Sequence, residues 1–201
     1  MKKVILNVPE DMAQELGNKL SELIKEFDIQ EDNDGVLDCL LPITERVKTF
    51  EDACKVLNGR AEAGDEDAAL LLADYESNAD NIKTSGIVAF MKLCIIAAAL
   101  NEGWKPQFTN DEYRWYPWFT LWTEEELKGK SEQWKKDHAL WLCGGNSYAG
   151  ATCGLASAYS DHAWSSSSSY ISARLAVKSK ELAVYFGKQF ISIWADYVGK
   201  F

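Results

Sequence analysis

Nineteen residues near the middle of the chain leave the fold little freedom. The segment SGIVAFMKLCIIAAALNEG, residues 85–103, is apolar almost all round, and Lys92 alone interrupts its run over residues 87–100. A helix without a polar face has to be surrounded by other elements. The run is too short to span a bilayer as a helix. The sequence therefore predicts a buried central helix, capped by Ser85 and closed by Gly103.

Three further helices are predicted before this one. Residues 8–27 carry an apolar stripe at helical spacing. The segment TFEDACKVLN, residues 49–58, begins with Thr49 and Asp52 at the spacing of a capping box and is expected to end at Gly59. A third helix is expected over residues 65–77, which open with three acidic side chains.

Composition divides the chain. Residues 1–80 carry 20 acidic and 8 basic side chains, whereas residues 81–201 carry 11 and 13, and all eight tryptophans lie from Trp104 onward. We expect an acidic helical part over 1–103 and an aromatic- and Ser/Gly-rich α+β part over 104–201, sharing one core. The predicted class is α+β, with a helical N-terminal part, an aromatic-rich mixed C-terminal part and a long C-terminal helix. The acidity argues against sequence-independent nucleic-acid binding.

The segment DEYRWYPWFTLW, residues 111–122, holds six aromatic residues and is expected to be extended. Its rings suit either a binding surface or a core. We favour the core for most of them, including Trp118 and Phe119, because six exposed rings would be poorly soluble. One or two rings, such as Trp115 or Trp118, are expected at the surface.

Beyond this segment, Thr123 and Glu126 predict a capped helix over residues 124–142. The next 26 residues, 144–169, include 17 that are Gly, Ser or Ala, with aromatic residues interspersed. This composition favours ordered, irregular β-structure over a linker, and a variable binding loop is an alternative. A strand-like segment over residues 170–179 and a helix capped by Ser179 complete the chain.

The cysteines and the first residues indicate the compartment. Five cysteines without the spacing of a disulfide framework predict reduced thiols in a cytoplasm. The apolar run at residues 4–6 is too short for the core of a signal peptide. No membrane association is expected.

No nucleotide-binding, nucleophile-elbow or zinc-protease motif is present in the sequence, and we expect no catalytic residue and no cofactor. The nearest candidate is a zinc-compatible set of two imidazoles and two thiols, which lacks the close ligand pairs of known zinc modules. The same residues, with Asp161, could form a nucleophile pair. The set comprises His138, Cys143, Cys153 and His162.

Three stretches carry a resemblance to a known family. KTFEDACKVL, KLCIIAAALNEGWKPQFTNDEYRWYPWF and SARLAVKSKELAVYFGKQFISIWADYV resemble a family of uncharacterised proteins encoded by phages and prophages of gut Bacteroidales. The resemblance runs over residues 48–198 and is least over 58–84 and 143–170. Ser172, Arg174 and Leu175 match the family pattern near the end, whereas Ala173 and Phe186 depart from it. The resemblance implies a phage origin, synthesis in the host cytoplasm and a virion-associated or host-directed role, and it assigns no site residue.

These observations favour a non-enzymatic phage protein that binds a protein partner, either as a virion component that contacts phage structural proteins or as an accessory factor. A carbohydrate- or receptor-recognition module is the first alternative, and an enzyme with a Cys/His or metal site is the second. The candidate binding residues are Trp115, Trp118, Tyr148, Tyr159, Trp164 and Tyr170.

Overall fold

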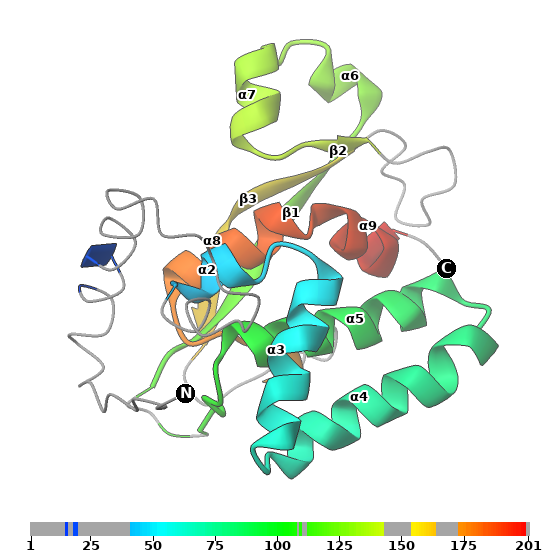
Figure 1. Ribbon diagram of the computed structural model, residues 1–201. Helices are drawn as coiled ribbons and strands as arrows, with labels where there is room; N and C mark the ends of the chain where they lie inside the picture. The colour runs from blue at the N-terminus through cyan, green and yellow to red at the C-terminus, as the bar shows by residue number, and fades with distance from the viewer. Residues whose placement is uncertain are drawn as a thin grey trace, which may run out of the picture. The chain divides into compact units, whose positions relative to one another are not determined.

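The computed structural model describes residues 15, 18, 19, 41–107, 109, 112–142, 154–163 and 173–199 (Figure 1). The chain forms two compact units, Met1–Arg46 and Val47–Phe201. The predicted division into an acidic helical part over 1–103 and an aromatic-rich part over 104–201 that share one core stays a prediction. In the first unit, the described residues of the segment 8–27 are helical, and the short helix α2 spans Ile43–Arg46. The remainder of the predicted helix over 8–27 lies outside the described residues.

The second unit begins with the helix pair α3 (Phe50–Glu62) and α4 (Glu66–Asn78). The predicted capping box at the start of α3 is confirmed: Thr49 Oγ1 accepts from the Asp52 amide at 3.1 Å, and Asp52 Oδ2 accepts from the Thr49 amide at 3.0 Å. The predicted end at Gly59 is wrong, because α3 continues through that glycine. The chain leaves the helix at Gly64, whose φ of +98° is the conformation that favours glycine.

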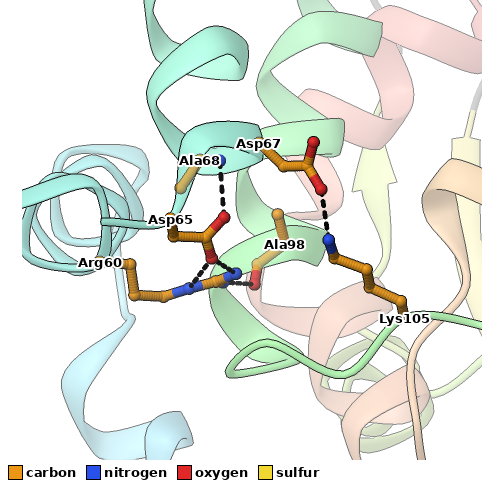
Figure 2. A network of polar contacts seen from close by, with 6 residues as sticks. All are labelled: Arg60, Asp65, Asp67, Ala68, Ala98 and Lys105. Carbon is orange, nitrogen blue, oxygen red and sulfur yellow. Dashed lines mark hydrogen bonds and ion pairs between the residues drawn. The ribbon is translucent and has the colours of Figure 1, made fainter. Parts of the chain in front are cut away.

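An ion pair fixes the turn between α3 and α4 (Figure 2). The Arg60 guanidinium donates through Nε at 3.1 Å and Nη2 at 2.5 Å to Asp65 Oδ2, and through Nη1 at 2.7 Å to the Ala98 carbonyl. Asp65 is also the N-cap of α4, since its other oxygen accepts from the Ala68 amide. Arg60 therefore links the end of α3, the start of α4 and the last turn of helix α5 (Ser85–Leu100), where a cation is favoured. Next to it, Lys105 pairs with Asp67.

Helix α5 (Ser85–Leu100) is the predicted central helix, and its burial is confirmed. It packs against α3 and α4 on one side and against the C-terminal segments η3 (Ala173–Leu175), α8 (Lys180–Gln189) and α9 (Ile191–Gly199). Residues 93–100 of this helix are buried, except for Ala98, which is half-buried. The N-cap is Thr84, one residue before the predicted Ser85, and the chain turns away through Glu102 and Gly103 at positive φ.

A three-stranded antiparallel sheet has the order β1-β3-β2, from β1 (Arg114–Trp122), β2 (Trp141–Leu142) and β3 (Gly154–Ala163). The central strand comes from the Gly/Ser/Ala-rich tract, so ordered β-structure is confirmed for these ten residues. Between Trp118 and Phe119 the register shifts, and Ala158 of β3 has no opposite residue in β1. The extra residue is thus a bulge in β3, and β1 keeps its regular alternation.

Two predicted elements between and after the strands were wrong. Residues 124–142 form two short helices, α6 (Glu124–Leu127) and α7 (Glu132–Asp137), followed by strand β2. Gly129 is a poor helix former, and Ser131 starts α7 as a new N-cap by accepting from the Trp134 amide. In the strand-like segment 170–179, the described residues form the 3₁₀ turn η3 and a single bridge between Val177 and Trp115.

The C-terminal helical region is confirmed, but it consists of two consecutive helices, α8 and α9, which meet at Phe190, instead of the one long helix that the sequence predicted. Ser179 is the N-cap of α8, as predicted, and accepts from the Leu182 amide. The rings of Phe186 and Trp194 form the aromatic part of the core, with centroids 5.0 Å apart. Together with the sheet, these helices confirm the α+β class. No helix in the described ranges has the length and hydrophobicity needed to cross a membrane.

Polar contacts join the beginning, middle and end of the second unit. The Asn101 side chain, 6% exposed, donates to the Ala176 carbonyl at 2.8 Å and accepts from the Lys178 amide at 3.1 Å. Tyr185 Oη donates to the Val47 carbonyl at 2.8 Å, and Gln189 Nε2 donates to the Lys48 carbonyl at 2.8 Å. Helix α8 therefore joins the end of the unit to its first residues.

Candidate aromatic binding surface

The aromatic residues of β1 divide between the two faces of the sheet. Because side chains alternate along a strand, Tyr116, Trp118 and Trp122 share one face, and Trp115 and Phe119 share the other. Phe119 lies against Trp194 of α9, with ring centroids 5.2 Å apart. Rings spread over both faces in this way can form neither one continuous core nor one flat platform.

The burial of these rings corrects the expectation that most of them are core. Tyr116 is buried and Tyr113 is exposed, whereas Trp115, Trp118, Phe119 and Trp122 are half-buried. Trp118 and Phe119, both predicted in the core, are thus only partly covered. Trp118 and Phe119 lie on opposite faces of β1, and each ring keeps part of its surface in contact with solvent.

The predicted binding residues separate in the structure. Trp115 and Trp118 lie on opposite faces of β1, and the Trp115 ring lies 5.9 Å from that of Tyr113. The register places Tyr159 of β3 opposite Trp118. The side chain of Tyr159, and all of Tyr148, Trp164 and Tyr170, lie outside the described residues, so their role in binding stays a prediction.

A compact aromatic cluster lies where β1 runs into the α6–α7 segment, and we call it the tryptophan corner. It consists of Trp122, Lys130, Trp134 and His138. The rings of Trp122 and Trp134 are nearly perpendicular, at 84°, with centroids 5.2 Å apart. Lys130 Nζ lies over both rings, 4.8 Å from each centroid. The His138 ring stacks on Trp134 at 4.2 Å and 19°.

Local sequence positions each member of the corner. Trp122 is the last residue of β1, and the next residue, Thr123, starts α6 with a capping box to Glu126. Hydrogen bonds from Thr123 hold the pKa of the Glu126 carboxyl below its usual value. Trp134 is fixed at the start of α7 by Ser131. His138 ends that helix, and its Nδ1 donates to the Trp134 carbonyl at 2.8 Å.

Among the described residues, a buried side chain and a hydrogen bond from α8 anchor the α6–α7 segment to the rest of the unit. Leu127 is buried, and Lys188 of α8 donates to the Asp137 carbonyl at the end of α7 at 2.7 Å. In Figure 1 the two helices lie beyond the sheet, on the side away from α3, α4 and α5. The corner is therefore presented at one end of the unit, with its four side chains half-buried.

The corner was missed by reasoning from the sequence, although a signal was present. Lys130, Trp134 and His138 are spaced by four residues, which places them on one side of a helical turn. The approach of Trp122 depends on the break at Gly129, which turns α7 back toward β1, and the predicted continuous helix concealed it.

The candidate metal ligands are only partly described. No group of three or more His, Cys, Asp or Glu side chains that could hold a metal ion occurs among the described residues. His138 belongs to the tryptophan corner, His162 is described only as a backbone position in β3, and Cys143 and Cys153 lie outside the described residues. Zinc binding and a Cys/His nucleophile at these positions therefore stay predictions.

The two described cysteines are poor nucleophiles. Burial raises the pKa of the Cys94 thiol to about 11. Burial and the nearby Glu51 carboxylate raise the pKa of the Cys54 thiol as well. Both thiols are therefore protonated at neutral pH, and neither forms a disulfide.

Comparisons of the chain with protein-family models, with curated proteins and with solved structures found no significant match in any of the three.

Proposed function

We propose that the chain is a non-enzymatic phage protein that binds a protein partner through the tryptophan corner, as a virion component or as an accessory factor. The observation that carries the proposal is the pair of half-buried tryptophan rings, Trp122 at the end of β1 and Trp134 in α7. The phage origin rests on the sequence resemblance over residues 48–198.

The corner has the composition of an interface centre. Tryptophan is enriched among the residues that dominate binding energy, because a large ring transfers much apolar area at low cost in conformational entropy. Charged side chains of both signs occur in the same segment: Lys130 lies over both rings, and Lys135 and Glu132 form an ion pair on α7. An apolar centre with a polar rim is the usual organisation of a protein–protein interface.

Carbohydrate or receptor recognition is a second candidate, favoured by the exposed Tyr113 ring and the half-buried Trp115 ring beside it. Neighbouring aromatic rings at a surface can stack on sugar rings. A glycan array tests this candidate. The wild-type chain should bind a glycan on the array, and a Trp115→Ala variant with an unchanged melting temperature should bind it less.

The protein-binding proposal is tested by cross-linking in infected host cells, followed by mass spectrometry of purified virions and of the cytoplasmic fraction. We expect a reproducible partner that cross-links to the wild-type chain and is lost with a Trp122→Leu/Trp134→Leu double variant. A Lys128→Gln variant of the same segment serves as the matched control, since Lys128 is exposed and has no part in the corner. A partner retained by the double variant, at wild-type yield, would contradict the proposal.

A further inference from the structure

The tryptophan corner already holds a cation. The ammonium group of Lys130 lies at equal distances from two perpendicular ring faces, 4.8 Å from each centroid. Among the described residues, Nζ lies over the two rings and is also attracted by the Glu126 carboxylate four residues earlier, and no ion pair or hydrogen bond of Nζ is found there. At this position the positive charge is attracted by the negative face of each ring.

We propose that the corner is a binding site for alkylammonium cations, in which Lys130 is a tethered occupant that a cation from outside the chain replaces. This inference goes beyond the proposed function, because it requires no protein partner. The ligand class follows from the group that the corner holds: a compact cation on an alkyl stem.

The walls of the site are fixed before a ligand enters. Trp122 ends a strand that pairs along its whole length with β3. Trp134 is held through its amide by Ser131 and through its carbonyl by His138, whose ring also stacks on the indole. A site with preorganised walls loses little conformational entropy when it binds.

The occupant, in contrast, is easily released. Lys130 lies in the turn between α6 and α7, and its backbone amide donates to the Leu127 carbonyl. Its side chain can leave the corner without breaking a helical hydrogen bond. A lysine ammonium is strongly hydrated, so water stabilises it once it is displaced. A methylated ammonium is less hydrated and gains more from the ring faces.

The geometry favours a cation over a sugar. A sugar ring stacks flat on one open aromatic face, whereas here two faces meet at 84° and leave a corner between them. A compact, nearly spherical group touches both faces at once. Two sources could present such a group: a free quaternary amine, or a methylated or unmodified lysine side chain of a protein.

The test uses the full chain and the indole N–H signals of Trp122 and Trp134 in NMR titrations at constant ionic strength. Choline is compared with 3,3-dimethylbutan-1-ol, its uncharged counterpart of the same shape. We expect choline to bind at least about tenfold more tightly, because only the charged ligand is attracted by the rings. Equal affinities of the two ligands, or no shift with choline, would overturn the proposal without any variant.

The role of Lys130 is tested in the same titration. A Lys130→Gln variant removes the tethered competitor, whose effective concentration is in the millimolar range, and should bind choline about threefold more tightly or better. Lys128→Gln, two residues away, should bind like the wild type. Unchanged affinity in Lys130→Gln would show that the lysine is no competitor, and the proposal would fail.

The source of the cation is decided by a third arm. Blocked peptides with lysine or trimethyllysine are titrated beside choline, and a preference for a peptide over choline assigns the site to a protein side chain. The reverse preference assigns it to a free amine. The Trp134→Leu variant should bind neither choline nor the peptides. If this variant does not fold, Trp122→Leu is used in its place. Full binding by a folded variant of either kind would contradict the assignment.

Discussion

At the scale of single residues, the degree of burial decides what each aromatic ring contributes. Trp118 is half-buried in β1, whereas Phe186 of α8 is fully buried between Phe190 and Trp194. We expect Trp118→Ala to lower the free energy of unfolding by about 1–2 kcal/mol and Phe186→Ala by about 3–5 kcal/mol, since only the second empties a closed site. Urea denaturation measures both. Equal losses would show that Trp118 is a core residue after all.

Asp65 gives a prediction about acid stability. The hydrogen bond from Arg60, helped by the amide of Ala68, lowers the pKa of the Asp65 carboxyl in the folded state. Near pH 4 the unfolded chain therefore binds more protons at this residue, so the stability contributed by Asp65 is present above the unfolded pKa and is lost as pH falls through the folded pKa. The melting temperature of Asp65→Asn should be lower than that of the wild type at pH 7, and the difference should shrink toward pH 3. A constant difference across this range would contradict the assignment.

At the scale of secondary-structure elements, the start of α3 offers a clean test. Thr49→Ala removes the acceptor of the Asp52 amide and should cost about 1 kcal/mol of stability, the usual effect of losing a side-chain N-cap. Thr49→Ser keeps the hydroxyl and serves as the control. Chemical denaturation of the two variants in parallel gives the difference, and an alanine variant as stable as the serine variant would show that the cap is dispensable.

Much of the fold was readable at this scale because caps and periodicity are local signals. Neighbours in the sequence are enough to predict three of the elements. The helices α3 and α8 are predicted from their N-caps, Thr49 and Ser179, and α5 is predicted from the apolar run over residues 87–100. The division of 124–142 into two helices and a strand was not readable in the same way. Glu126 predicts a helix start, but the strand at Trp141 forms only because β3 supplies its partner.

The candidate site, too, was predictable from the sequence only where it depends on local patterns. The aromatic richness of residues 111–122 is visible in the sequence, and so is the spacing of Lys130, Trp134 and His138. Their assembly into a corner with Trp122 depends on long-range strand pairing and on a turn at Gly129. Sequence patterns predict which side chains could take part in a site, and tertiary contacts decide which of them lie in contact.

At the scale of the whole molecule, the second unit contains the helices that pack around the central helix α5. The buried residues of α3, α4, α5, α8 and α9 all belong to Val47–Phe201. We expect a fragment comprising residues 47–201 to unfold cooperatively on heating, with a near-ultraviolet circular dichroism spectrum like that of the full chain, because its tryptophans keep their packing. A fragment without a sharp melting transition would show that the first 46 residues are required.

The closure of the second unit by its last helices has a consequence for synthesis on the ribosome. The central helix α5 ends at Leu100, but α9, which covers it, ends only at Gly199. At about 5–20 residues per second, the most apolar segment of the chain waits about 5–20 s for its cover. During that interval the nascent chain exposes a surface on which chaperones act and copies aggregate. A chain that stops before residue 180 should therefore accumulate in inclusion bodies, which fractionation of expressing cells would detect, whereas the complete chain hides this surface as soon as α8 and α9 emerge.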